Sequence, residues 1–181
     1  MRKIFVFIIL SALIFPLIVQ AKSIDMNFGE DAFRFAYAFG IDKNLVTDLG
    51  IMQVEGEGRN RDDELAFHAG LNVTSGNVRF GGRAFLVSPG DFDTLSVGFG
   101  GQGRIPLSRH VGIGGHFYYA PEVTSFMDSK GYHEYRVNVD FKVTRSAYVY
   151  LGYRNVKVRI ENRNNKVELN DDVIFGFKVY F

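Results

Sequence analysis

The feature that most constrains this chain is a period-two alternation of apolar and polar residues that continues over most of its length. In the clearest segment, His133 to Val143, every second residue from Tyr135 onward is apolar and the residues between are polar or charged. Successive side chains of a strand point to opposite faces, so each such segment is predicted to be a strand with one face in an apolar medium. After the first twenty residues no segment has the length or the period of a membrane-spanning helix. The sequence therefore predicts an all-β protein.

The connections between the alternating segments are long and short in turn. The long ones are Gly58–Asp63, Ser88–Asp91, Pro121–Gly131 and Asn162–Lys166; the short ones are Gly40–Asn44, Thr74–Asn77, Pro106–Ser108 and Thr144–Ser146. Long outer loops and short periplasmic turns are typical of transmembrane barrels. A first strand over Ser23–Phe28 with a turn at Gly29-Glu30 completes an antiparallel up-and-down β-barrel of about ten strands. Eight strands is the alternative, if that first segment stays unpaired.

The N-terminus has the organisation of a secretory signal. Arg2 and Lys3 precede an apolar run from Ile4 to Val19, and Ala21 suits the last position before a cleavage site. A transmembrane anchor is the alternative, although Pro16 would break a spanning helix. We expect residues 1–21 to be a signal peptide cleaved near Ala21, which leaves residues 22–181 as one domain.

The last strand carries an apolar residue at every second position and ends the chain on an aromatic residue. These residues are Val173, Phe175, Phe177, Val179 and Phe181. An alternating final strand of this kind resembles the recognition signal that the outer-membrane barrel assembly machinery reads. The sequence thus predicts a monomer in the outer membrane of a Gram-negative cell, with membrane lipid and that machinery as partners. The alternative is the last strand of a soluble β-sandwich.

Composition argues against several other classes of partner. The chain has no cysteine, so neither a disulfide nor a thiolate metal site is available. The charges nearly balance, which does not indicate a nucleic-acid partner. Histidines at metal-ligand spacing are missing, so no metal and no cofactor is predicted.

The face opposite the lipid is charged. The residues predicted to form a charge network in the lumen are Arg79, Arg83, Arg104, Glu134, Arg136, Asp140, Lys142, Arg154 and Lys178, and Arg34, Glu64, His68 and His116 share this face. A ten-stranded barrel is narrow enough to be nearly filled by side chains, and buried charges must pair or keep water. A structural salt-bridge network is the favoured interpretation, in which Arg154 pairs with Glu134 or Asp140. A selectivity path for small anions is the alternative, because basic residues outnumber acidic ones.

Glycines recur on the same inward face. They are Gly70, Gly81, Gly98, Gly100, Gly112, Gly114, Gly152 and Gly176. The favoured interpretation is that they permit the tight curvature of a narrow barrel. The alternative is that they make room for long side chains that cross the lumen.

An enzyme is the alternative from a different functional class. Some small outer-membrane barrels modify lipids, which requires a nucleophile beside a base. None of His68, His110, His116 and His133 has a serine two residues later, so no catalytic residue is predicted and the chain is not expected to be an enzyme. A loop-mediated adhesion or interaction scaffold, with Val123–Lys130 as the contacting loop, is a further alternative.

The C-terminal half is similar to one known family. The segment Tyr118-Tyr119-Ala120-Pro121-Glu122, the strand Tyr132–Val143 and the segment Leu151-Gly152-Tyr153-Arg154 resemble the YfaZ family of outer-membrane proteins. The resemblance covers about residues 95 to 181. It implies an outer-membrane barrel of structural or narrow-pore type, and it supplies no established activity or catalytic residue.

Overall fold

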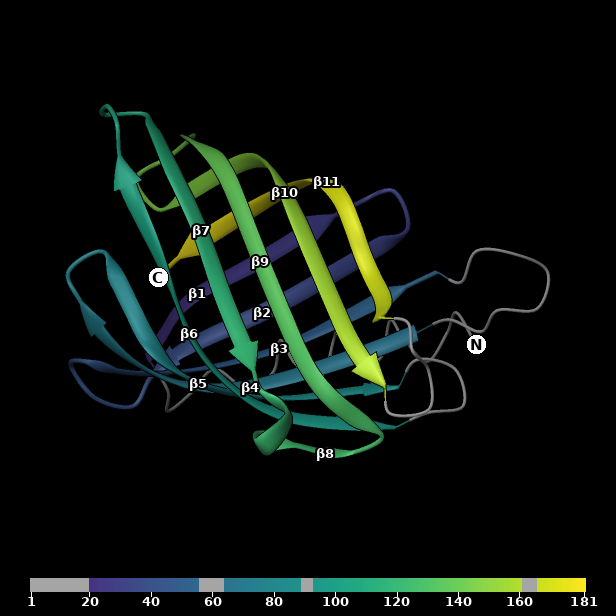
Figure 1. The fold of residues 1–181 in the computed structure, drawn as a ribbon. Helices are drawn as coiled ribbons and strands as arrows, with labels where there is room; N and C mark the ends of the chain where they lie inside the picture. The colour runs from purple at the N-terminus through teal and green to yellow at the C-terminus, as the bar shows by residue number, and fades with distance from the viewer. Residues whose placement is uncertain (1–19, 56–63, 89–92, 161–165) are drawn as a thin grey trace, which may run out of the picture.

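The computed structural model describes residues 20–55, 64–88, 93–160 and 166–181 and shows a closed antiparallel barrel (Figure 1). Its ten barrel strands are β1 (Gln20–Phe28), β2 (Ala32–Gly40), β3 (Leu45–Val54), β4 (Glu64–Ser75), β5 (Val78–Ser88), β6 (Thr94–Pro106), β7 (Val111–Ala120), β9 (Ser129–Lys142), β10 (Ala147–Ile160) and β11 (Lys166–Tyr180). Each strand pairs with its neighbours along the chain, and β1 pairs with β11 to close the sheet. Within these ranges no helix has the length and apolar character needed to cross a membrane.

The first strand decides between ten strands and eight. β1 pairs on one side with β2 and on the other with β11, for example Met26 opposite both Phe35 and Phe177. The prediction of a ten-stranded barrel is therefore confirmed, with the first turn at Gly29-Glu30 as expected. Most of the predicted signal peptide, residues 1–19, lies outside the described residues, and β1 begins beside the predicted cleavage site.

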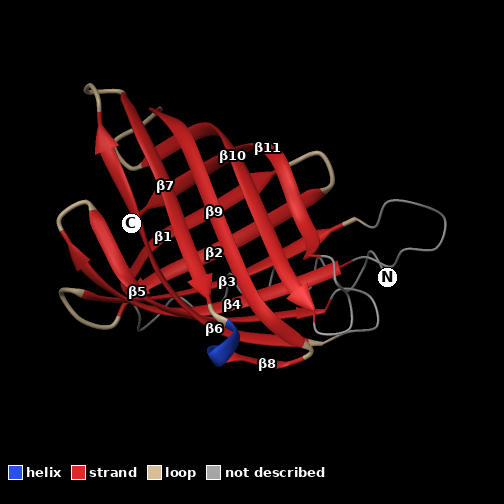
Figure 2. Ribbon diagram, viewed as in Figure 1, coloured by secondary structure: helices blue, strands red, loops and turns tan. Residues whose placement is uncertain are grey.

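The two ends of the barrel differ. The C-terminus and the short turns 41–44, 76–77, 107–110 and 143–146 lie at one end, which we call the turn end (Figure 2). The opposite end, the loop end, carries the connection between β7 and β9. The predicted long loops near residues 56–63, 89–92 and 161–165 fall largely outside the described residues. Short turns are periplasmic in transmembrane barrels, so the turn end is the end that we expect to face the periplasm.

The connection between β7 and β9 is more ordered than the simple loop that the sequence predicts. It forms a single 3₁₀ turn, η1 (Glu122–Thr124), followed by a short strand, β8 (Ser125–Met127). β8 pairs with Thr94–Ser96 of β6, which extends past the end of β7. An unpaired sheet edge exposes backbone donors and acceptors. The extra strand satisfies the edge that β6 would otherwise leave open.

The outer face is apolar, as the alternation predicts. Alternate residues of most strands expose large side chains, for example Phe67 and Leu71 on β4 and Val137, Val139 and Phe141 on β9. In the hydrocarbon layer every backbone group must be bonded within the protein, and closure achieves this. The apolar outer face and the closed sheet are together the requirements of a membrane barrel.

The inner face has an apolar half that the sequence analysis did not predict. Buried apolar side chains at the loop-end halves of the strands form one cluster: Ala32, Met52, Val54, Ala66, Phe85, Val87, Tyr118, Ala120, Tyr132, Val156, Val158, Ile160 and Leu169. At its centre the rings of Phe85 and Tyr132 stack with centroids 4.0 Å apart, and Tyr118 is 0% exposed. We call this cluster the apolar plug. It occupies a large part of the loop-end half of the lumen.

The inward glycines serve both of the roles that the sequence suggests. A Cβ on Gly100 would lie 2.0 Å from the carbonyl oxygen of Phe117 on the neighbouring strand, so the close approach of two backbones requires glycine there. A Cβ on Gly112 would instead lie 2.4 Å from the guanidinium of Arg104. Curvature explains the first position, and room for a lumen side chain explains the second.

Candidate functional site

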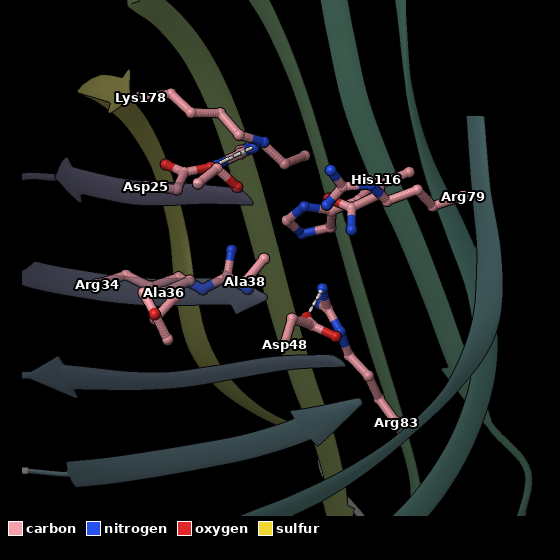
Figure 3. A pocket seen from close by; sticks show the side chains of 13 residues that line it. Asp25, Arg34, Ala36, Ala38, Asp48, Arg79, Arg83, His116 and Lys178 are labelled. Atoms are coloured by element: carbon pink, nitrogen blue, oxygen red, sulfur yellow. Dashed lines mark hydrogen bonds and ion pairs between the residues drawn. The ribbon is translucent and has the colours of Figure 1, made fainter. Parts of the chain in front are cut away.

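The polar part of the lumen lies between the apolar plug and the turn end. Its side chains come from all around the barrel and point toward the centre, as Figure 3 shows for Asp25, Asp48, Arg83, His116 and Lys178. They form groups, each built around one carboxylate. Because inward residues alternate with outward ones on every strand, the fold itself directs these charges into the bore.

The first group surrounds Asp48 of β3. Its carboxylate forms an ion pair with Arg83 of β5 and accepts a hydrogen bond from the Asn72 amide at 2.7 Å. His68 Nε2 lies 3.5 Å from the same carboxylate, and the Arg83 guanidinium lies 3.9 Å from the ring centroid of Tyr118. Asp48 therefore ties three neighbouring strands together within the lumen.

The second group surrounds Glu134 of β9, which is 3% exposed. Its Oε1 lies 2.7 Å from His116 Nε2 and 3.3 Å from Arg34 NH1. The Tyr132 hydroxyl donates to the other carboxylate oxygen at 2.9 Å. Tyr132 also stacks on Phe85, so this group joins the charged lumen to the apolar plug.

The third group surrounds Asp25 of β1. Arg136 NH2 donates to its carboxylate at 3.1 Å, and the Tyr150 hydroxyl donates to the other oxygen at 2.5 Å. Arg136 NH1 donates to the Tyr150 hydroxyl at 3.0 Å, which completes a triangle. Lys178 Nζ lies 3.9 Å from Asp25.

Two other predicted residues form contacts nearer the ends of the bore. Arg104 donates to both oxygens of Asp140, with its shortest bond at 2.6 Å, near the turn end. Arg154 is 0% exposed and donates to the amide oxygens of Asn170 and Asn27. The expected pairing of Arg154 with Glu134 or Asp140 is therefore wrong, because its hydrogen bonds go to the two asparagines.

The remaining predicted residues lie less deep. Lys142 is half-buried near the end of β9, and Arg79 is half-buried near the start of β5, both at the turn end. The prediction missed Asp25 and Asp48, the acidic centres of two groups. Asp25 lies between two apolar residues, Ile24 and Met26, so the same periodicity was sufficient to find it. Asp48 lies between Thr47 and Leu49, where the alternation is weaker.

A small cavity of about 20 Å³ opens among these groups toward the turn end. Its lining includes Ser23, Asp25, Arg34, Asp48, Arg79, Gln102, Arg83, His116, Arg136 and Lys178. We call this cavity the turn-end chamber. A volume of roughly 10–15 Å³ holds one water molecule, so the enclosed part of the chamber has room for little more than one water and is too small for a chain molecule.

A second, larger cavity of about 320 Å³ lies at the loop end and is acidic. Its lining residues are Glu30, Asp31, Val54, Glu55, Glu64, Glu168, Leu169, Asn170, Asp171 and Asp172. In the part of the chain that the structure describes, no three histidine or acidic side chains are grouped closely enough to hold a metal ion.

The lumen histidines are not arranged for nucleophilic catalysis. His68 contacts Asp48 and His116 contacts Glu134. Within the described residues neither has a hydrogen bond to a serine or threonine hydroxyl, the nucleophile that such a base would activate. Both histidines instead contribute to the ion-pair groups.

A closed ten-stranded barrel with an apolar outer face and a filled, charged lumen defines the class of small outer-membrane β-barrels. The fold is similar to that of the outer membrane protease OmpT from Escherichia coli, with 11% identity, a TM-score of 0.55, and coverage of 90% of this chain and 93% of that one. The KdgM porin (8%, TM-score 0.44) and the NanC porin (8%, TM-score 0.43) each match over 89% of this chain and 99% of theirs.

The family follows from the sequence. The model of the YfaZ precursor family matches residues 1–181, and the chain belongs to that family. The match extends the resemblance seen in the C-terminal half to the whole chain. No curated protein matches the sequence. The precursor family and the barrel fold together support an outer-membrane location.

Proposed function

We propose that this protein is a monomeric structural barrel of the outer membrane whose bore is closed and does not conduct ions. The observation that carries the proposal is the apolar plug, in which the stacked rings of Phe85 and Tyr132 lie across the loop-end half of the lumen. Narrow barrels are filled by their own side chains, whereas aqueous channels appear near sixteen strands. The ion-pair groups fill most of the other half, so the narrow-pore alternative has less support.

The proposal includes the absence of catalysis. The buried histidines contact carboxylates that are already engaged with arginines, and a base needs a reacting group within hydrogen-bond reach. The similarity to a protease is a similarity of fold, because the two chains are only 11% identical. We also propose that the chain is exported through a signal peptide cleaved near Ala21.

Planar-bilayer recording tests whether the bore is closed. We expect the purified, refolded wild-type protein to show no discrete conductance steps. The double variant Phe85→Ala, Tyr132→Ala removes both stacked rings and should produce steps, because a gap then connects the loop end with the turn-end chamber. Phe80→Ala is the matched control, since Phe80 lies on the outer face at 60% exposure and its loss leaves the lumen unchanged.

Discrete steps in the wild-type protein would contradict the closed-bore proposal. In that case the preference of the current for anions or cations would identify the solute class of a narrow pore. Overexpression followed by analysis of lipid A and phospholipid tests the proposed absence of lipid-modifying activity; an altered lipid would contradict it.

A further inference from the structure

We propose that the turn-end chamber binds one small inorganic oxyanion, of the phosphate or sulfate type, from the periplasmic side. The chamber is lined by more positive than negative side chains. The cations are Arg34, Arg79, Arg83, Arg136 and Lys178, and the carboxylates are those of Asp25 and Asp48. Glu134 lies outside the lining and pairs with Arg34. When its charge is counted too, the positive charges are still in excess.

The carboxylates of the lumen are already engaged. Asp48 forms an ion pair with Arg83. Asp25 forms ion pairs with both Arg136 and Lys178, the latter at the long distance of 3.9 Å. Arg79 has no ion-pair partner among the residues that the structure describes, although it lines the chamber (Figure 3). Arg79 and Lys178 are therefore the chamber's weakly compensated charges.

Buried hydrogen-bond donors point to the same conclusion. Nε and NH1 of Arg83 and Nε of Arg136 have no hydrogen-bond partner, and the side chains of these two residues are only 3% and 7% exposed. A buried donor without a partner costs about 1–3 kcal/mol, and more when the group is charged. Two arginines in the same lining thus have donor capacity that the protein itself does not use.

A bound oxyanion would balance the excess positive charge of the chamber and also accept hydrogen bonds from the unpaired arginine donors. It supplies the missing negative charge in a region of low dielectric, and its oxygens match the forked N–H groups of a guanidinium. The enclosed volume of about 20 Å³ is little more than one water molecule needs, so the chamber excludes a sugar or an oligomer and the anion sits at its turn-end opening, beside Arg79 and Lys178. Because Arg79 and Lys178 are half-buried at the turn end, the anion enters from the periplasm.

Calorimetric titration of the refolded protein in detergent with inorganic phosphate, at an ionic strength fixed with sodium chloride, tests the proposal. We expect saturable binding at one site. Arg79→Gln and Lys178→Gln should each weaken it at least about tenfold, the effect of losing one charge-assisted hydrogen bond. Arg109→Gln, at an exposed turn of the same end, is the matched control and should bind like the wild type.

No saturable binding to the wild-type protein would overturn the proposal, as would equal affinity in all four proteins. A shared folding defect is detected by the heat-modifiability of each variant. Arg79 is a suitable site because no carboxylate among the described residues forms an ion pair with it. The result is independent of the closed-bore proposal: a wild-type protein that conducts and still binds phosphate through Arg79 refutes only the closed bore.

Discussion

At the scale of single residues, the lumen depends on carboxylates that each satisfy several partners. Asp48 shows this most clearly, because it contacts Arg83, Asn72 and His68 from two neighbouring strands. A buried ion pair adds little net stability compared with apolar packing, but the loss of one partner leaves the other charge uncompensated. The barrel is therefore expected to be sensitive to substitution of these shared carboxylates.

The first prediction concerns Asp48. We expect Asp48→Ala to lower the free energy of unfolding by about 3–5 kcal/mol, because Arg83 then keeps a buried charge without a counterion. The measurement is urea denaturation of the refolded barrel. Unfolding is monitored by far-ultraviolet circular dichroism, a signal that does not depend on tryptophan. Asp42→Ala, in the exposed turn after β2, is the control. Equal stabilities of the two variants would show that the Asp48 group has no structural weight.

The second prediction compares two glycines of β6. A Cβ on Gly100 would lie 2.0 Å from a backbone oxygen, whereas a Cβ on Gly103 would meet its nearest atom at 3.5 Å, an ordinary contact. We expect Gly100→Ala to reduce the folded fraction strongly and Gly103→Ala to leave it nearly unchanged. The folded fraction is read from the unboiled gel band after refolding. A tolerated Gly100→Ala would contradict the close approach of the two strands.

At the scale of elements, β11 has two separable roles. It closes the barrel by pairing with both β1 and β10, and we propose that its apolar residues Val173, Phe175, Phe177, Val179 and Phe181 also form the assembly signal. Val173 and Phe175 are more than half exposed on the outer face. Phe181 lies beyond the last paired residue and is 73% exposed, so it contributes little to the fold.

The third prediction uses that separation. We expect deletion of Phe181 to reduce the amount of folded protein in the outer membrane of cells, while refolding of the purified chain into detergent stays unchanged. The control is the substitution Arg145→Ala in an exposed turn, which is milder than a deletion because it keeps the length of the turn. It should change neither assembly in cells nor refolding in detergent. Unchanged assembly of the truncated chain in cells would contradict a signal role for the terminal phenylalanine.

The strands and their faces follow from the sequence because the membrane imposes alternation on every strand. His133–Val143 has its apolar face outward as predicted, and Ser23–Phe28 forms the tenth strand. The pairing partners do not follow from alternation, because register depends on which inward side chains meet across the bore. For this reason the partner of Arg154 was wrong, and Asn27, 127 positions earlier in the chain, was not foreseen.

The apolar plug was also missed, and the cause is physical. In Val156–Ile160 the alternation persists but is reversed: Val156, Val158 and Ile160 face the lumen, and the residues between them are charged. A period of two gives two faces and does not say which of them points inward. The extra strand β8 arises from a tertiary need, the open edge of β6, which a local pattern does not report. The sequence therefore predicted the charged side chains of the lumen but not the apolar plug at its loop end.

At the scale of the whole molecule, the barrel is divided into two halves with different interiors. The loop-end half has the apolar core of a soluble domain, and the turn-end half has ion pairs around a small chamber. This division is the basis of the proposal that the bore is closed and that its polar groups are accessible from the turn end. The whole description depends on the outer face lying in lipid.

The measurement that tests this most directly is a heat-modifiability gel on fractionated cells. We expect the protein in the outer-membrane fraction, with an unboiled band that migrates differently from the boiled one, because a closed barrel resists unfolding by detergent until it is heated. Recovery of the protein from the soluble periplasm with a single band in both lanes would contradict a membrane barrel and would assign the apolar outer face to some other partner than lipid.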